Sequence, residues 1–240
     1  MKLKFIFILV FTAGLLFILS GCSLKYSVAV DSINNRQQIK DKTFIIAAGN
    51  KDVKTNDLQF QEYACQLASA LSHKGYKQVD RKNIEDAAIE IFLSYGVGDP
   101  QKHEYSYAEP VWGQVGTNVY RYATVETRED GKIEYRSHET TDPEYGIKGY
   151  VTKTKEYTSY TKFIVIDAYS LNVKNSEDKL KPLWKTTITF TNEDPQLRKY
   201  YPYMITAAYP HITENTGKTL KVTIDTDSEL VEETCGIDFK

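Results

Sequence analysis

Three consecutive stretches decide the fold: TFIIAA at Thr43–Ala48, NDLQFQEYACQLASALSHKG at Asn56–Gly75, and AAIEIFLSYGV at Ala87–Val97. The first is a short apolar run, and the third alternates apolar and polar residues as a half-buried strand does. The middle stretch repeats its apolar residues at helical spacing. We therefore expect a strand, a helix and a strand, forming a βαβ unit whose two strands lie side by side or one apart.

The helix in the middle stretch has clear start and stop signals. Asn56 can cap its first turn, with Gln59 in the reciprocal capping position, and Gly75 stands where a left-handed C-terminal residue is needed. One face carries apolar residues at steps of three and four, namely Phe60, Ala64, Leu67 and Leu71. This face is expected to pack on the core, and Cys65 is expected to be a small buried residue beside it.

Further strands and a second helix are predicted downstream. A hairpin is expected around the turn dipeptide Asp130-Gly131, and a helix is expected after Asp194-Pro195, with Pro202 either kinking or dividing it. The expected strands are Val119–Glu126 and Lys132–Ser137 in the hairpin, Tyr157–Leu171 and Trp184–Phe190 as an antiparallel pair, and Thr219–Ile224 at the end. The acidic tail that follows is expected to be loosely held.

The N-terminus has the layout of a secretory signal. Two lysines precede the apolar run Phe5–Leu19, which is shorter than the roughly 20 residues that a membrane-spanning helix needs. The run ends in Leu19-Ser20-Gly21-Cys22, which resembles the lipobox of bacterial lipoproteins. The resemblance implies that Cys22 is lipidated and becomes the first mature residue, so that acyl chains hold the protein on a membrane.

The residue after the cysteine bears on the destination. In proteins with such a lipobox, serine rather than aspartate at this position is typical of transport to the outer membrane. Ser23 therefore implies an outer-membrane protein, lipid-anchored on the periplasmic side of the cell envelope. In a bacterium with one membrane, the same anchor would place the protein on the outer face of the plasma membrane.

These elements predict the α+β class: a mixed, mostly antiparallel sheet of about five strands, with two helices on one face and a hairpin insertion. Residues 1–21 are interpreted as a lipoprotein signal peptide and 22–42 as a lipidated N-terminus and tether. Residues 43–240 are interpreted as a single α+β domain with a Tyr-rich insertion at about 101–150.

Charge and composition exclude some classes of partner. The chain has 30 Lys and Arg against 32 Asp and Glu, a net charge of −2, and the signal peptide removes two of the lysines. Because there is no basic excess to attract phosphate backbones, a nucleic-acid partner is not expected. Membrane attachment is expected through the lipid on Cys22 rather than through a polybasic patch.

Two cysteines remain after Cys22, and the sequence does not settle whether they pair. In an oxidising envelope Cys65 and Cys235 could form a disulfide, but connectivity depends on geometry. Neither shows the surroundings of an activated nucleophile.

Motifs for catalysis, metals and cofactors are missing or incomplete. The Gly217-Lys218-Thr219 end of a phosphate-binding loop has Ile212 where the earlier glycine belongs, and a strand rather than a helix follows it. The four histidines are scattered, without the spacing of a metal site. The carboxylates offer no privileged pair for a glycosidase. We predict no catalytic residue, no metal and no cofactor.

Aromatic residues in the Tyr-rich insertion are the candidate binding residues. Tyr107 and Trp112 lie in a long polar connection of the type that can line a binding surface. Tyr120 and Tyr122 can serve as a stacking platform for a sugar or a peptide. Both features have plainer explanations, because tyrosines favour strands and Trp112 could pin a loop over the edge of the sheet.

Short motifs along the chain resemble those of a known family. They are Leu58–Tyr63, Lys74-Gly75-Tyr76, Tyr95–Pro100, Pro110–Gly113, Pro182-Leu183-Trp184, Leu197-Arg198, Tyr201–Met204 and Asn215-Thr216-Gly217, all after the lipobox. In this order they resemble the bacterial lipoproteins built on domain-of-unknown-function family 4136. The resemblance implies a secreted, anchored α+β domain and carries over no catalytic residues.

These observations favour a membrane-anchored envelope lipoprotein that is not an enzyme and binds another envelope protein or the cell wall. One alternative is an envelope hydrolase acting on glycan or peptide, which would need a cleft with two facing acids. Another is a carrier of a lipid or other apolar ligand, which would need an internal apolar cavity.

Overall fold

The computed structural model describes residues 24–36, 39–130, 133–174 and 180–236. The expected signal peptide, Cys22 and Ser23 therefore lie outside the described residues, as does Gly131 of the expected turn. Within the described part of the chain, no helix combines the length and the apolar character needed to cross a membrane.

The contacts divide the chain into two compact units. The first, which we call the sheet unit, combines Met1–Gln101 with Ser159–Lys240, and the second, the ribbon unit, is Lys102–Thr158. The residues expected to form a Tyr-rich insertion, about 101–150, fall almost entirely within the ribbon unit. Each unit is described below by itself.

The predicted fold class is wrong, because the sheet is larger than expected and is covered by more helices. Eight strands form one mixed sheet in the order β3-β2-β4-β6-β7-β1-β8, with β5 paired to β6, where about five strands and two helices were expected. The strands are β1 (Lys25–Asn34), β2 (Thr43–Ala48), β3 (Lys77–Gln78), β4 (Ile89–Val97), β5 (Gln101–Thr127), β6 (Ile133–Lys174), β7 (Leu180–Asn192) and β8 (Leu220–Asp225). The helices are α2 (Leu58–His73), α3 (Leu197–Ala208) and α4 (Glu229–Cys235), with a 3-10 turn η2 at Arg81–Asp86.

Two elements missing from the prediction account for much of this difference. The residues expected to form a tether include β1, which pairs antiparallel with both β7 and β8. The acidic tail, expected to be loosely held, contains α4, whose Val231 and Cys235 are buried. Both elements bury apolar side chains, which offset the entropy of ordering these segments.

The predicted βαβ unit is confirmed. β2 and β4 are parallel neighbours, with Ile46 opposite Ile91, and α2 spans the sequence between them. All four residues predicted for the core face of α2 are buried. The N-cap is Asp57 rather than Asn56, and its carboxylate accepts the backbone N–H groups of Gln59 and Phe60. Cys65, expected to be buried, is exposed.

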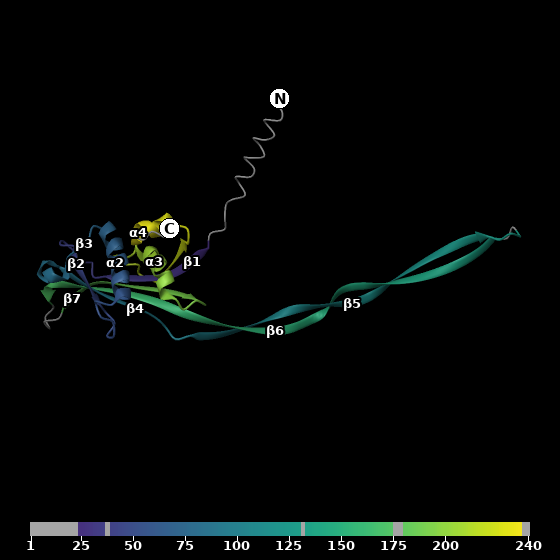
Figure 1. Ribbon diagram of the computed structural model, residues 1–240, viewed down its shortest axis with the longest axis horizontal. Helices are drawn as coiled ribbons and strands as arrows, with labels where there is room; N and C mark the ends of the chain where they lie inside the picture. Colours follow the sequence, from purple (N-terminus) through teal and green to yellow (C-terminus); the bar gives the residue numbers. More distant parts are fainter. Residues whose placement is uncertain (1–23, 37–38, 131–132, 175–179, 237–240) are drawn as a thin grey trace, which may run out of the picture. The chain divides into compact units, whose positions relative to one another are not determined.

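The core lies between one face of the sheet and the three α helices, which gather on the same side of the sheet in Figure 1. Alternate residues of the strands point into it, as in β4, where Ile89, Ile91 and Leu93 are buried. The rings of Tyr63 on α2 and Tyr201 on α3 stack with centroids 4.0 Å apart. The Tyr201 hydroxyl also donates to the Tyr63 carbonyl at 3.1 Å, which joins the two helices.

α3 is one helix with Pro202 inside its first half, so the proline does not divide it. The helix begins after Gln196, two residues later than the expected cap at Asp194. At its other side α3 contacts α4, where the Cys235 thiol donates to the Pro202 carbonyl oxygen at 3.5 Å. Since that carbonyl lies in the helix interior, α4 is fixed directly against α3.

Candidate functional site

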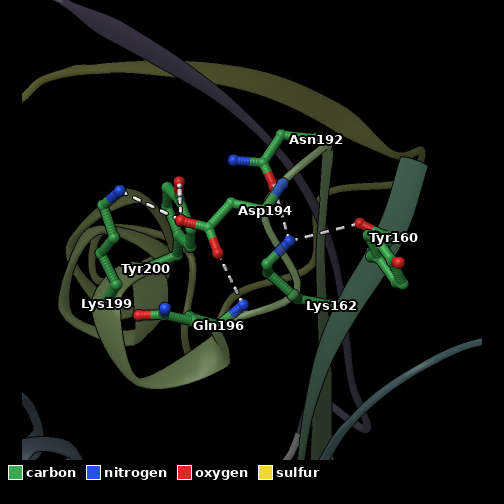
Figure 2. Close-up of polar contacts among 7 residues, drawn as sticks. All are labelled: Tyr160, Lys162, Asn192, Asp194, Gln196, Lys199 and Tyr200. Carbon is green, nitrogen blue, oxygen red and sulfur yellow. Dashed lines mark hydrogen bonds and ion pairs between the residues drawn. The ribbon is translucent and has the colours of Figure 1, made fainter. Parts of the chain in front are cut away.

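A buried lysine lies at the centre of a polar cluster in the sheet unit (Figure 2). The Lys162 side chain comes from β6 and is fully enclosed. Its ammonium group donates to Asn192 Oδ1 at 2.6 Å and to the Tyr160 carbonyl oxygen at 3.3 Å. It also lies 5.0 Å from the ring centroid of Tyr200. Burial lowers the pKa of Lys162, while the charge of Asp194 acts in the opposite direction.

Asp194 connects this cluster to the start of α3 (Figure 2). Its carboxylate accepts the Gln196 backbone N–H at 2.9 Å, Lys199 Nζ at 3.0 Å and the Tyr200 hydroxyl at 3.0 Å. The backbone bond from Gln196, followed by the bond from Lys199, lowers the pKa of Asp194 to about 2. The negative charge also lies at the positive end of the helix dipole.

The cluster predicts a contribution to stability that is present at neutral pH and changes only in the acid range. Asp194 has a lower pKa folded, about 2, than its ordinary value of 3.8, so the stability it contributes is present above 3.8 and is lost as the pH falls through 2. We expect Asp194→Asn to lower the urea midpoint at neutral pH and the deficit to shrink as the pH falls through this window. Asp52→Asn, at an exposed position, is the control. A deficit that does not change with pH would contradict this role for the Asp194 charge.

The hydrogen bonds of this cluster connect parts of the fold to one another. Lys162 is enclosed, so a substrate in solvent has no access to its amine. Its hydrogen bonds run to the end of β7 and to β6 itself, and Asp194 holds the first turn of α3. The cluster therefore fastens the β7–α3 connection to the sheet.

The face of the sheet away from the helices carries an open groove. It has a volume of about 580 Å³ and is lined in part by Phe92, Val165, Tyr169 and Leu180. The rings of Phe92 and Tyr169 meet edge to face at 5.7 Å. This hollow lies on the surface of the sheet, whereas the carrier alternative needs an internal cavity.

Metal-ligating side chains and the two thiols were the other candidates for a reactive site within the described residues. No group of three or more His, Cys, Asp and Glu side chains in this part could hold a metal ion. Both Cys65 and Cys235 are free thiols. Burial raises the pKa of Cys235 to about 12, which leaves this thiol protonated and poorly nucleophilic at neutral pH.

The four predicted binding residues all lie on β5 in the ribbon unit, and all are exposed. The exposed fractions of their side chains are 44% for Tyr107, 69% for Trp112, and 54% each for Tyr120 and Tyr122. Trp112 does not pin a loop, because the polar connection in which it was expected is a strand.

The structure does not bring these four residues together. At about 3.4 Å per strand residue, Tyr107 and Trp112 lie roughly 17 Å apart along β5, and Tyr120 lies roughly 27 Å beyond Trp112. Tyr122 instead stacks on His138 of β6, with ring centroids 5.1 Å apart. Tyr107 neighbours Tyr105, with centroids 6.1 Å apart. The candidate site is therefore a line of side chains along the ribbon.

Other exposed apolar residues share the ribbon and were not predicted. They are Tyr105, Val111, Val115, Val119, Val125, Tyr145, Ile147, Tyr150, Val151 and Tyr157. Their types favour strands, and this was the signal that could have identified a longer ribbon. The expected hairpin covered only its tip.

Cross-strand contacts hold the two strands of the ribbon together. They include a stack of His103 on Tyr157, a hydrogen bond between Ser106 and Thr154, and ion pairs of Arg121 with Glu139 and of Glu109 with Lys153. Most of these groups are exposed, so each pair adds little to the stability of the ribbon.

The register of the ribbon changes in its middle. Ser106 lies opposite Thr154 and Arg121 lies opposite Glu139. Between these pairs, Gly113 meets Lys148 and Gly146 meets Val115, one residue out of step with both ends. Such an offset requires an extra residue on each strand, which is the arrangement of a β-bulge. Residue parity therefore does not assign one continuous face to the ribbon.

Comparisons with known proteins show no family for this chain. No family model matches it, and no curated protein matches it. Among solved structures, it has a likeness to a PDZ domain protein from Parabacteroides distasonis ATCC 8503, with 14% identity over 85% of this chain and 40% of that one and a TM-score of 0.38. A second likeness, to the lysenin pore, has 9% identity over 85% and 49% of the two chains and a TM-score of 0.11. The chain thus spans less than half the length of either protein, and neither likeness informs its fold or function. The resemblance to family 4136 stays a prediction.

Proposed function

We propose that this protein is a lipid-anchored, non-enzymatic protein of the bacterial cell envelope that binds another envelope protein through its ribbon unit. The anchor is the lipid on Cys22, and Ser23 favours the periplasmic side of the outer membrane. The proposal rests on the signal sequence for location and on the ribbon unit for binding.

One observation carries the binding role: most of the large hydrophobic side chains exposed in the described residues belong to the ribbon unit. Monomeric proteins rarely expose many apolar side chains together, and such patches mark interaction surfaces. Tyrosine and tryptophan are also enriched where proteins bind one another, because they combine apolar area with a polar group.

The energetics of a two-stranded ribbon support the same role. β5 alone is 27 residues long, or roughly 90 Å at about 3.3 Å per residue. Two strands without a packed face are only marginally stable in water. A partner that covers the aromatic side chains would supply the missing burial, at about 25 cal/mol per Å² of apolar surface.

The cell wall is the second candidate ligand. The observation that favours it is the exposure of Trp112, Tyr120 and Tyr122, since aromatic rings can stack on sugars. The hydrolase receives no such support. Asp41 and Asp194 have clearly shifted pKa values, and both of these pKa values are lowered. A catalytic acid needs a raised pKa.

Crosslinking in intact cells tests the proposal. An amine-reactive reagent would act on the lipidated protein, which would then be purified and its attached species identified by mass spectrometry. We expect a reproducible protein partner joined through the ribbon lysines Lys148, Lys153 and Lys155. Lysines of the sheet unit, such as Lys54 and Lys82, provide the internal control.

Each alternative has its own result in this experiment. Recovery of cell-wall fragments without a protein would show that the cell wall, and not another envelope protein, is the ligand. Crosslinks that join a partner only through Lys54, Lys82 and other lysines of the sheet unit would contradict a ribbon-based site.

A further inference from the structure

One edge of β6 is uncovered in the ribbon unit. β5 pairs with β6 on one side, and β7 covers the other side only from Tyr160, which lies opposite Asn192. Within the part of the chain that the structure describes, no strand pairs with that second edge over residues 133–158. A long strand edge of this kind presents a row of backbone N–H and C=O groups, which is a template for another strand.

The charges along this edge are divided into two halves. The half nearer the hairpin tip, residues 134–144, is acidic: it carries Glu134, Glu139, Asp142 and Glu144 against one basic residue, Arg136. The half that follows, residues 148–158, is basic on balance: it carries Lys148, Lys153 and Lys155 against one acidic residue, Glu156. This edge of β6 therefore has an acidic half and a basic half, one after the other along the strand.

We propose that two copies of this chain pair along this edge, β6 against β6 in antiparallel orientation. The antiparallel arrangement places the acidic half of each strand opposite the basic half of the other. Because a two-fold axis relates the two strands, this contact between opposite charges occurs once on each side of the axis. Opposite charges that face each other across strands are stabilising, whereas a parallel pair would set like charges against like. The acidic and basic halves still face each other if the two strands shift by a residue or two. The match of charges therefore does not depend on the β-bulges in the ribbon.

The other edge of the ribbon is less suited to self-pairing. On β5 the charges are interleaved, with Lys102 near Glu104 at one end and Arg121 near Glu126 towards the other. An antiparallel pair of β5 strands would therefore not set an acidic segment against a basic one. Pairing of β5 with β6 of a second copy would be heterologous and could continue indefinitely, whereas pairing of β6 with β6 closes as a dimer.

The dimer would also change the stability of the ribbon. It joins two two-stranded ribbons into a four-stranded sheet, and three or more strands can be stable where two are marginal. Pro143 imposes a cost, because it has no N–H and leaves one ladder hydrogen bond unmade on each side of the axis. The inference uses the backbone edge of β6, so it does not require the aromatic contacts proposed above.

Charge reversal on the full lipidated protein in detergent tests the dimer. One variant, Asp142→Lys with Glu144→Lys, makes the acidic half basic. The other, Lys148→Glu with Lys155→Glu, makes the basic half acidic. Both leave the internal pairs Arg121–Glu139 and Glu109–Lys153 intact, so the ribbon itself keeps its cross-strand contacts.

Sedimentation equilibrium would give the oligomeric state of each protein. We expect a dimer for the parent chain and weaker self-association, by tenfold or more, for each variant alone. Mixing the two variants should restore a dimer, since a basic strand then meets an acidic one. A variant that merely misfolds would not recover in the mixture. A parent chain that stays monomeric, or variants that dimerise as the parent does, would overturn the proposal.

Hydrogen exchange identifies the surface that forms the dimer. Backbone amides of residues 134–156 should become more protected as the protein concentration rises, and those of β5 should not. Protection that appears only when envelope extract is added would mean that a different chain occupies the edge, which contradicts self-pairing. A monomer that still crosslinks to an envelope protein through its ribbon would overturn the dimer alone and leave the proposed function standing.

Discussion

Leu67→Asp is expected to unfold the sheet unit. Leu67 is fully buried on the face of α2 that packs on the core, and a carboxylate there would have neither solvent nor a charged partner. The expected loss exceeds about 4 kcal/mol, which is comparable with the whole free energy of unfolding of many domains. Circular dichroism and the urea midpoint would measure it.

The same substitution at Leu58 provides a matched control. Leu58 is the first residue of the same helix and is 81% exposed. An aspartate in the first turn interacts favourably with the helix dipole, so Leu58→Asp should be neutral or slightly stabilising. A folded Leu67→Asp variant with the parent's midpoint would show that this face of α2 does not form the core.

Cys22→Ala is expected to abolish membrane attachment. In the proposed lipoprotein the Sγ atom of Cys22 carries the lipid, and alanine has no side-chain atom that can take its place. The protein should then remain as the uncleaved precursor or leave the membrane fraction after cleavage. Fractionation of cells, followed by mass measurement of the protein, distinguishes these two forms from the lipidated chain.

Cys65→Ala is the control for the loss of a thiol. Cys65 is an exposed free cysteine on α2, and its replacement should leave both lipidation and membrane retention unchanged. Membrane retention of the Cys22→Ala variant at the parent's level would contradict the anchor and, with it, the proposed location.

The sequence predicted the elements whose signals are local. Helix α2 has a capping side chain, a regular apolar stripe and Gly75 at a positive φ of 79°, so each boundary could be placed within a residue or two. β2 and β4 follow from their apolar patterns and from the length of the crossover between them. These features depend on neighbours in the chain rather than on distant partners.

Elements that depend on distant partners were missed. β1 places Val28 and Val30 in the core, but Ser32 interrupts the apolar alternation. Ser32 is tolerated because its hydroxyl bonds that of Thr186 at 2.7 Å, and this partner lies on β7. In the same way, the sequence of α4 resembles an acidic tail. Its burial of Val231 and Cys235 depends on contacts with α2 and α3, which are distant in the sequence.

The candidate site was predicted by residue type and missed in its arrangement. Tyr107, Trp112, Tyr120 and Tyr122 are exposed, but the spacing of a long strand separates most of them. A two-stranded ribbon has no buried face, so it produces no strict alternation of apolar and polar residues, and β-bulges shift its register further. The sequence pattern therefore predicted strands only for the part of the ribbon next to the expected turn.

Site-specific photo-crosslinking tests the binding role of the ribbon most directly. A photoreactive amino acid would replace Trp112 in one protein and Leu58, exposed on the sheet unit, in a second, and each would be irradiated in intact cells. The proposed function predicts that the Trp112 position captures an envelope protein of defined mass while the Leu58 position captures none. Capture of that same protein at Leu58 and none at Trp112 would contradict it.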